Sequence, residues 1–328
     1  MSAVCESPFA PALLVCPRCH ARPTSAADGL RCGKCGKVYP IVDGIPVLLL
    51  DVQAAEHDEL HEHHHTRAAR NQQQTQFFDH QVDVEFEVTR PHGTPALYRW
   101  YYEEKFRISI AGLEAMLPGA TVLTVCGGSG MDAEFLALRG ARVIASDLSL
   151  GAMRRTCERA RRYNLPIEPL VADVTKLPFA DRSIDLVYVH DGLHHLEDPF
   201  EGLREMTRVA GRAVSLTEPA DAWATKIAVH LGLSMEWEEA GNRVARMKEK
   251  PIGDFLRSQG FIIGNSSRYA MYYKHHPGRF IAWLSKPGVL EVTRKAVRLG
   301  NALIGRFGNR LGMTAVRDGA TAPRLFSA

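Results

Sequence analysis

The sequence predicts an α/β protein, in which a mostly parallel sheet carries helices on both faces and a small cysteine-rich domain comes first. Residues 96–285 alternate short β-branched runs with longer helical patterns, which is the arrangement of consecutive βαβ units. Residues 13–50 are instead rich in Cys, Gly and Pro, and contain two Cys-x-x-Cys pairs. We therefore divide the chain into a cysteine-rich domain (1–50), a polar linker rich in His and Gln (51–95), the α/β domain (96–285) and a basic helical tail (286–328).

The composition limits the location and the partners of the protein. Hydrophobic residues make up 45% of the 328 residues, and the formal net charge is only +3, which argues against nucleic acid as a partner. No apolar run reaches the ~18 residues of a membrane-spanning helix, and residues 1–12 lack the pattern of a secretory signal. Cys5, Cys126 and Cys157 lie outside the two pairs, so we expect unpaired thiols and a cytoplasmic location.

Two cysteine knuckles near the N-terminus predict a structural zinc site. Cys16 and Cys19 form the first knuckle, and Cys32 and Cys35 form the second. Four thiolates around one tetrahedral Zn²⁺ make a closed site, and the ion stabilises a segment too small to fold on a hydrophobic core. A pair of redox dithiols is the alternative. The strand–turn–strand pattern of residues 38–49 resembles the Trm112-like zinc-ribbon domains, which implies a structural or substrate-presenting role.

Histidines crowd the polar linker. His57, His61 and His65 would share one face of a helix, where they can bind a metal, and His63 and His64 lie between them. We favour the interpretation of a solvated helix that joins two domains.

A glycine-rich turn follows the first strand of the α/β domain. Residues 121–126 form a buried β-branched run that ends in Gly127, Gly128 and Gly130, and a helical pattern begins at Met131. Glycines at a strand-to-helix turn let a ligand approach the backbone, and the start of the helix offers free N–H groups. Asp147 ends the next strand, where a carboxylate can hold both hydroxyls of a ribose. These residues fit a dinucleotide site equally well.

The downstream pattern separates these alternatives. A third strand ends at Asp173, and a fourth leads into His190, His194 and His195. This succession resembles the class I methyltransferases, particularly the branch of the ubiquinone and menaquinone methyltransferases. The resemblance implies a Rossmann-like fold with a seven-stranded sheet, and S-adenosylmethionine as cofactor. The cofactor-binding residues that it implies are Gly127, Gly128, Gly130, Asp147, Leu148, Asp173, Val174 and His190.

Within that resemblance, the two glycines Gly128 and Gly130 line the methionine part of the cofactor, Asp147 binds its ribose and Asp173 accepts from its adenine. Two positions depart from the family pattern. Thr124 stands where an acidic residue is usual, and Cys126 stands where glycine is usual, so Cys126 narrows the site near the sulfonium.

The acceptor side is predicted from ionisable residues at the end of the fourth strand. His190, His194 and His195 are the candidate catalytic residues, because a neutral imidazole can take a proton from a hydroxyl. Neighbouring residues point in different directions, so we expect at most one of His194 and His195 to face the acceptor. Glu218 opens onto the same edge. Residues 236–243 suggest either a substrate-recognition insertion or a solvated acidic helix, and the aromatic cluster at 98–102 forms either a lid or core packing.

The tail shows the pattern of a basic amphipathic helix. Its apolar stripe consists of Val289, Val292, Ala296, Leu299, Leu303, Phe307 and Leu311. We favour docking of this stripe on the protein's own domain or on a second subunit, and contact with an anionic membrane surface is the alternative.

These observations lead to a functional hypothesis. The chain transfers a methyl group from S-adenosylmethionine to a small-molecule acceptor (a secondary metabolite, lipid or glycan precursor) by direct displacement. Three alternatives stay open at this stage: an RNA methyltransferase that uses the ribbon to hold RNA, a non-catalytic binding protein on a degenerate methyltransferase fold, and an NAD-dependent oxidoreductase.

Overall fold

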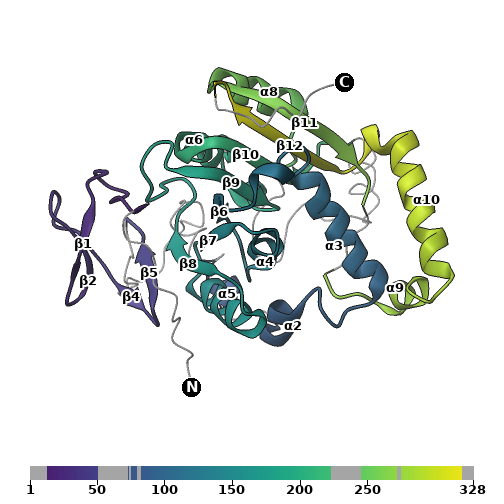
Figure 1. Cartoon of the computed structure of the whole chain (residues 1–328), viewed down its shortest axis with the longest axis horizontal. Coiled ribbons are helices and arrows are strands. Elements are labelled where there is room, and N and C mark those ends of the chain that lie inside the picture. Colours follow the sequence, from purple (N-terminus) through teal and green to yellow (C-terminus); the bar gives the residue numbers. More distant parts are fainter. Residues whose placement is uncertain are drawn as a thin grey trace, which may run out of the picture.

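A computed structural model describes residues 13–50, 73, 75–79, 83–222, 245–271 and 275–319 (Figure 1). The histidine cluster at 57–65 and the predicted insertion at 236–243 lie outside these residues, so both interpretations stay predictions.

One mixed sheet of nine strands organises the molecule. Its strands, in sheet order, are β11 (Phe261–Tyr269), β12 (Arg310–Arg317), β10 (Ala210–Pro219), β9 (Ile184–His190), β6 (Thr121–Val125), β7 (Arg142–Asp147), β8 (Ile167–Ala172), β5 (Ile45–Leu48) and β4 (Ile41–Val42). The strands from β10 to β5 run parallel, β12 is antiparallel to both of its neighbours, and β4 pairs antiparallel with β5. The predicted mostly parallel α/β fold is confirmed, and two of the nine strands come from the cysteine-rich domain.

Helices cover both faces of this sheet, as the βαβ pattern predicts. They are α2 (Val84–Thr89), α3 (Ala96–Ser109), α4 (Met131–Ala137), α5 (Leu150–Tyr163), α6 (Pro199–Val209), α8 (Glu249–Ser258), α9 (Arg279–Leu284) and α10 (Val289–Ile304), with 3₁₀ turns η2 (Glu114–Met116), η3 (Leu193–His195) and η4 (Gly305–Phe307). Successive residues of β6 pack in opposite directions, so Val122 joins the core under α3 and α4 while Leu123 joins the core under α6 and α8. This two-sided burial explains why β6 is a continuous apolar run.

The cysteine-rich domain is built into the main sheet. Its three-stranded sheet consists of β1 (Pro23–Ala26), β2 (Gly29–Cys32) and β3 (Val38–Tyr39), and the following hairpin β4–β5 adds to the edge strand β8. Leu14 and Tyr39 are buried in the core that also holds α6, and Val15 N donates to Pro178 O at 2.9 Å. The domain at the purple end of the chain in Figure 1 therefore shares its core with the α/β domain.

Two elements pack across the predicted boundaries. The tail does not stay separate from 286 onward, because β12 inserts between β10 and β11. Its helix ends at Ile304, before Gly305 and Gly308, and Leu311 lies buried on β12 instead of on a helical stripe. The end of the predicted linker also belongs to the α/β domain, since α2 buries Glu87 and Val88.

Two findings bear on the predicted location. Among the described residues, no helix is long and apolar enough to cross a membrane. Cys157 is disulfide-bonded, so the prediction of an unpaired thiol there is wrong, whereas Cys126 is free and Cys5 lies outside the described residues. The cysteine argument for a reducing compartment loses part of its basis, and the cytoplasmic location stays a prediction.

Candidate active site

The predicted cofactor residues meet at the carboxyl edge of the sheet. Strand β6 pairs with β7 on one side and with β9 on the other, so the chain leaves β6 and β9 toward opposite halves of the sheet. The crevice outside such a switch point is where open α/β sheets bind ligands. The glycine turn, Asp147, Asp173 and His190 all lie at or just beyond the strand ends there.

The glycine turn has a backbone that side chains would disturb. Gly128 and Gly130 adopt left-handed φ angles of 53° and 77°. A Cβ at Gly130 would lie 2.9 Å from the side chain of Thr156, whereas a Cβ at Gly128 would meet nothing within 4 Å. A Cβ at Gly127 would lie 3.1 Å from Thr124 Oγ1. The turn is therefore held against α5 on one side and open at Gly128.

Asp147 is oriented by the turns on both sides of it. Its Oδ2 accepts from Gly128 N and its Oδ1 accepts from Ser149 N, both at 2.9 Å. Burial raises the pKa of this carboxyl group, and the two N–H donors oppose that change by favouring the ionised form. Leu148 is half-buried between Asp147 and Ser149, the residue that caps α5.

Asp173 and Val174 follow β8 at the same edge. Asp173 Oδ1 accepts from Thr175 N at 2.8 Å and from Thr175 Oγ1 at 2.7 Å, which fixes the carboxylate in an Asx-type turn. Val174 is buried in the core with α6.

Two buried arginines of α5 connect the glycine turn to Phe78 and to helix α2. Arg155 Nε donates to Ser129 Oγ at 3.0 Å and its Nη2 donates to Phe78 O at 2.7 Å. Arg159 Nε donates to Ser129 O at 2.8 Å, and Glu87 Oε2 of α2 accepts from Ser129 Oγ at 2.9 Å. Burial would raise the pKa of Glu87, but the contacts with His275 and Arg90 lower this pKa to about 2. The carboxylate is therefore ionised. The turn is thus fixed from beneath by charges that the sequence analysis did not identify.

His190 lies at the end of β9 in a closed environment. Its Nδ1 is 3.6 Å from Asp132 Oδ1, and its ring packs edge-on against Phe106 at 5.4 Å. Nε2 is buried without a hydrogen-bond partner in the part of the chain that the structure describes. Burial, aided by the nearby Lys105 ammonium, lowers the pKa of His190 well below its usual value. The imidazole is therefore neutral at pH 7.

A buried ion cluster lies beside this histidine. Arg310 of β12 donates to both carboxylate oxygens of Asp191, at 2.6 and 2.7 Å, and Lys105 Nζ donates to Oδ2 at 3.0 Å. Burial lowers the pKa of Lys105 to about 8, against the attraction of Asp191. Burial would raise the pKa of Asp191, but the two cations hold it well below its usual value. Asp191 therefore stays ionised and fully occupied by its partners.

Asp132, in the first turn of α4, is a carboxyl group whose pKa this environment raises. Burial raises its pKa to about 7, because the opposing attraction of Lys105 is smaller than the desolvation. A carboxyl group that titrates near neutrality is suited to take up or release a proton. The sequence analysis missed Asp132, Lys105 and Arg310.

The two adjacent histidines have different surroundings. His194 is buried, and its Nδ1 lies 2.8 Å from Glu218 Oε2, while Glu218 Oε1 also accepts from the N–H groups of Gly192 and Leu193. This contact fixes the turn η3 to the end of β10, and the catalytic role of His194 stays a prediction. His195 is half-buried and contacts the ring of Phe78 edge-on at 6.1 Å. It also acts to lower the pKa of Asp147, so it lies near that predicted cofactor residue.

Cys126 explains why glycine is usual at its position. Its φ of 52° is left-handed, a conformation that costs a side chain about 1 kcal/mol. A Cβ at Gly192 would lie 2.4 Å from the Cβ of Cys126, so Gly192 provides the room that the extra side chain needs. Burial raises the pKa of the Cys126 thiol well above its usual value, which keeps it neutral.

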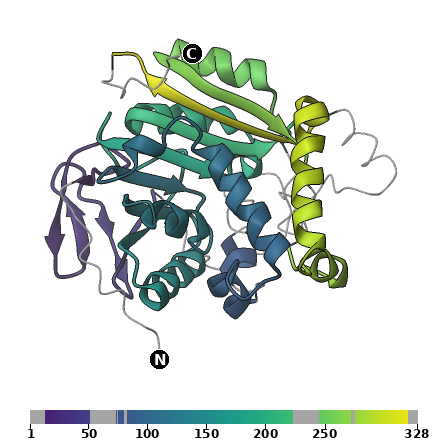
Figure 2. The ribbon, with the colours of Figure 1, turned by 45° about the vertical axis from the view of Figure 1, so that its right-hand side comes forward.

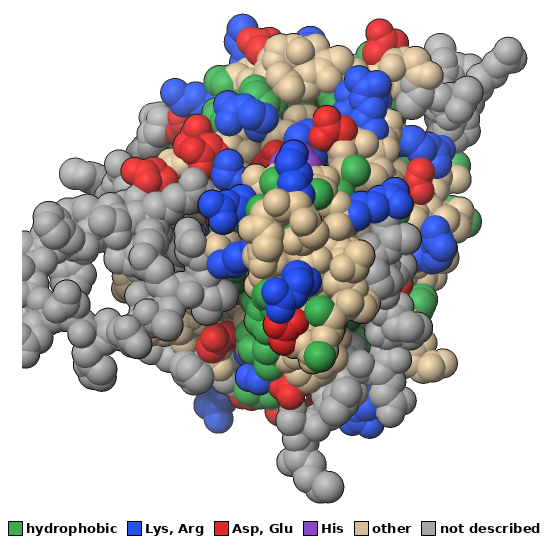
Figure 3. Space-filling view, turned by 90° about the vertical axis from the view of Figure 1, so that its left-hand side faces the viewer, with side chains coloured by type: hydrophobic (Ala, Val, Ile, Leu, Met, Phe, Trp, Pro, Cys, Tyr) green, Lys and Arg blue, Asp and Glu red, His purple; other side chains and the backbone are tan. Residues whose placement is uncertain are grey.

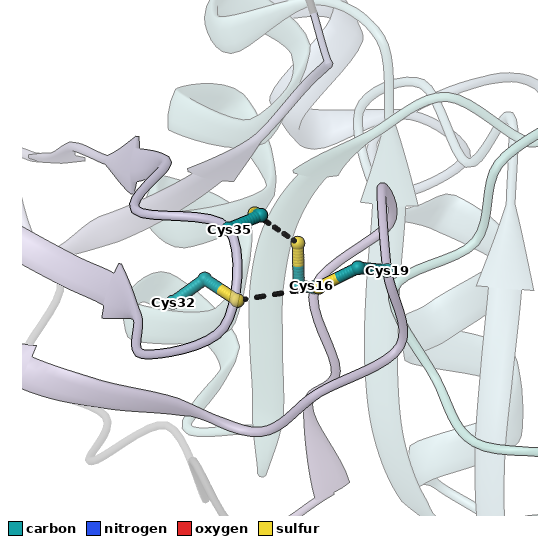
Figure 4. A group of neighbouring side chains, drawn as sticks. All are labelled: Cys16, Cys19, Cys32 and Cys35. Carbon is teal, nitrogen blue, oxygen red and sulfur yellow. Dashed lines mark hydrogen bonds between the residues drawn. The ribbon is translucent and has the colours of Figure 1, made fainter.

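The four predicted metal ligands come together (Figure 4). Cys16 Sγ lies 3.6 Å from Cys35 Sγ, and Cys19 Sγ lies 3.4 Å from Cys32 Sγ. A tetrahedral ion bound at about 2.3 Å places its sulfurs about 3.8 Å apart, so the spacing fits Zn²⁺. Tyr39 Oη lies 3.0 Å from Cys16 Sγ, as outer hydrogen-bond partners of metal ligands do.

Comparisons with known proteins identify the fold at this edge. Residues 123–213 match the family described as "Methyltransferase domain". The demethylmenaquinone methyltransferase of Corynebacterium urealyticum is 38% identical over 110 residues, which cover 34% of this chain and 43% of that protein. That of Thermobifida fusca is 37% identical over 112 residues, which cover 32% and 46%. Residues 123–213 of the chain are therefore similar to a methyltransferase domain.

Solved structures agree with this assignment at the level of the fold. The magnesium protoporphyrin IX methyltransferase of Synechocystis PCC 6803 superposes with a TM-score of 0.52 at 19% identity, covering 74% of this chain and 98% of that one. The 4+2 cyclase SpnF superposes with a TM-score of 0.53 at 17% identity, covering 75% and 96%.

The sequence match has a clear limit. It spans less than half of the length of the curated relatives, and it covers the strands from β6 to β10. Lys105 and Arg310, which both contact Asp191, lie outside the matched residues.

Proposed function

We propose that the chain transfers a methyl group from S-adenosylmethionine to a small-molecule acceptor. The match to a methyltransferase domain supports this reaction class. Within the matched residues, Asp147 is the side chain that best supports a site for the cofactor. When bound, S-adenosylmethionine supplies a methyl group on a sulfonium that is already activated for displacement.

Asp147 fits the ribose of such a cofactor. Each of its oxygens accepts one N–H of the protein, from Gly128 or from Ser149. Each carboxylate oxygen can accept twice, so one lone pair per oxygen is left for a ribose hydroxyl. The glycine turn leaves open space at Gly128, beside this carboxylate.

Calorimetric titration with S-adenosylhomocysteine, with NADH as the parallel ligand, tests the cofactor. We expect micromolar binding of the first and none of the second. Asp147→Ala should weaken the binding by about 1–3 kcal/mol, because buried hydroxyls lose their acceptor. Asp181→Ala, which removes an exposed carboxylate paired with Arg208, is the matched control. Binding of NADH alone would overturn the proposal, and binding of neither ligand would favour the non-catalytic alternative.

The acceptor side can support direct displacement without a nucleophile from the protein. The neutral thiol of Cys126 is no such nucleophile. The protein has to align the acceptor behind the methyl group, exclude water and remove a proton where the acceptor carries one. His190 lies between Phe106 and Asp132 with its Nε2 3.6 Å from Asp191 Oδ2, and it is placed to orient the acceptor at this edge.

Asp132 is better suited than His190 to hold the proton. Lys105 and burial both oppose a positive charge on the imidazole, so His190 is a weak base. The pKa of Asp132 is about 7, so a large fraction of this carboxyl group is ionised at neutral pH and can accept a proton. Transfer should therefore increase with pH through about 7, and Asp132→Asn should abolish this dependence. His190→Gln should instead raise the KM for the acceptor.

We expect the acceptor to be a small molecule that carries a weakly acidic hydroxyl group on a ring. The relatives are named as demethylmenaquinone methyltransferases, which points to an acceptor with a quinone-like ring. A tritium transfer assay with a panel of phenols and quinols tests this class, and total RNA is included as a separate substrate. On the face in Figure 3, Lys and Arg are interspersed with acidic and other side chains and form no single basic stripe.

A further inference from the structure

Exposed apolar side chains gather on one part of the molecule. Among the described residues, eleven large hydrophobic side chains are exposed, and seven of them lie between residues 280 and 307. They are Phe280 and Trp283 of α9, Val292, Leu299, Leu303 and Ile304 of α10, and Phe307 of η4. We call these seven residues the α9–α10 surface. Helix α10 lies at the edge of the molecule beside α3 (Figures 1 and 2).

The register of α10 explains this exposure. The helix packs inward through Leu290 and Val297, which contact the core that contains α3. Arg294 and Arg298 lie over the ring of Trp100, at 5.8 and 5.5 Å. The predicted stripe of Val292, Ala296, Leu299 and Leu303 therefore points outward, and the prediction that it docks on the protein's own domain is wrong.

The same surface has a strong excess of positive charge. Residues 279–307 contain six basic residues and one acidic residue. The acid, Glu291, pairs with Arg294, and Arg298 pairs with Glu104 of α3. Lys295 and Arg306 are exposed beside the apolar side chains, and Arg306 lies 4.7 Å from the ring of Phe307.

We propose that the α9–α10 surface binds the face of an anionic lipid bilayer without crossing it. Exposed Leu, Phe and Trp side chains beside Lys and Arg match the two parts of such a bilayer, its apolar boundary and its negative headgroups. A second copy of the chain fits less well, because a twofold dimer would place this basic surface against itself. The proposal concerns a surface away from the glycine turn and does not depend on methyl transfer.

Flotation of the full chain with vesicles tests the proposal. We expect binding to vesicles that contain phosphatidylglycerol and none to vesicles of phosphatidylcholine alone. Leu299→Ser/Leu303→Ser should weaken the binding at least tenfold, whereas Leu138→Ser, which changes an equally exposed leucine at the end of α4 and outside the α9–α10 surface, should leave it unchanged. Neutralising Lys295 or Arg306 to Gln should weaken it about fivefold per residue.

Fluorescence of Trp283 in a Trp223→Phe/Trp237→Phe background gives an independent readout, because half of this side chain is exposed whereas Trp100 is buried. Its emission should shift to shorter wavelength on anionic vesicles, and the shift should be lost in Trp283→Phe. Absence of vesicle binding would overturn the proposal, as would equal binding of the Leu299→Ser/Leu303→Ser and Leu138→Ser variants. A mass of two chains by light scattering that returns to one chain in Leu299→Ser/Leu303→Ser, without vesicle binding, would assign the surface to a dimer instead. Failure of S-adenosylhomocysteine binding would affect none of these outcomes.

Discussion

Replacement of Arg159 by Met tests the charge network beneath the glycine turn. Arg159 is completely buried and uses its guanidinium in four hydrogen bonds. Nε donates to Ser129 O at 2.8 Å, Nη1 donates to Glu134 Oε2 at 2.5 Å, and Nη2 donates to the carbonyls of Glu87 and Arg90 at 2.6 and 2.8 Å. Methionine keeps much of the stem of the side chain and removes every donor.

The expected loss of stability follows from the partners that stay behind. Glu134 is buried, and after the substitution its contact with the half-exposed ring of His92 is the main compensation left for its charge. Removal of one partner from a buried ion pair costs about 3–5 kcal/mol. That is a large share of the roughly 5–15 kcal/mol by which domains are stable. We expect Arg159→Met to lower the free energy of unfolding by about 4 kcal/mol, and Arg159→Met/Glu134→Gln to recover about 1–2 kcal/mol because the unpaired charge is gone.

Urea unfolding followed by circular dichroism measures both values. Arg161→Met is the matched control on the same helix, since Arg161 is two-thirds exposed and makes a surface pair with Glu158. That substitution should cost less than about 0.5 kcal/mol. A loss below 1 kcal/mol in Arg159→Met, or no recovery in the double variant, would refute the reasoning that the buried charge pair stabilises the turn.

Three further outcomes are expected. Removal of zinc with a chelator should lower the temperature of the main unfolding transition in calorimetry, because β5 of the ribbon pairs with β8; a separate small transition with the main one unchanged would contradict this. Gly192→Ala should cost about 1–3 kcal/mol in urea unfolding, because its methyl group meets Cys126, and Cys126→Gly/Gly192→Ala should recover most of that loss. Burial raises the pKa of Asp132 to about 7, so the folded state keeps this proton to a higher pH than the unfolded state. The free energy of unfolding of the wild type should therefore fall as the pH rises from about 4 to 7. Asp132→Asn should remove this fall and be the more stable protein at pH 8. Equal pH profiles of the two proteins would contradict a raised pKa of Asp132.

The cofactor edge could be predicted from the sequence because parallel strands bring their carboxyl ends together. Once β6 and β7 were recognised as buried runs, the glycine turn and Asp147 had to lie side by side. The cysteine pairs were equally informative, since four thiols at that spacing can meet around one ion. The order of motifs added the class of fold.

The acceptor side was less predictable because it joins distant parts of the chain. Arg310 reaches Asp191 only because β12 inserts between β10 and β11, and no local pattern marks that insertion. Lys105 meets the same carboxylate from α3. Arg155 and Arg159 did leave a local signal: they occupy the face of α5 that is otherwise apolar or small, where a charged side chain has to find buried partners.

The amphipathic tail shows a different limit of sequence reasoning. Periodicity identified the apolar stripe of α10, but it does not state which face of a helix meets the protein. The guanidinium groups of Arg294 and Arg298 lie over the ring of Trp100, so a nominally polar face provides the contact and the apolar stripe is left outside.

The position of the ribbon bears on its role in the protein. Strand β5 pairs with β8 at Val47–Val171 and Leu48–Ala172, and Asp173 is the next residue after β8. Without β5, β8 would be an unpaired sheet edge directly beside a predicted cofactor residue. A metal ion at the four cysteines would fix the loops that lead into the hairpin β4–β5, and through it the edge of the catalytic sheet. We infer that the ribbon supports the cofactor site as an integral part of the methyltransferase domain, rather than acting as a separate module for recognising nucleic acid.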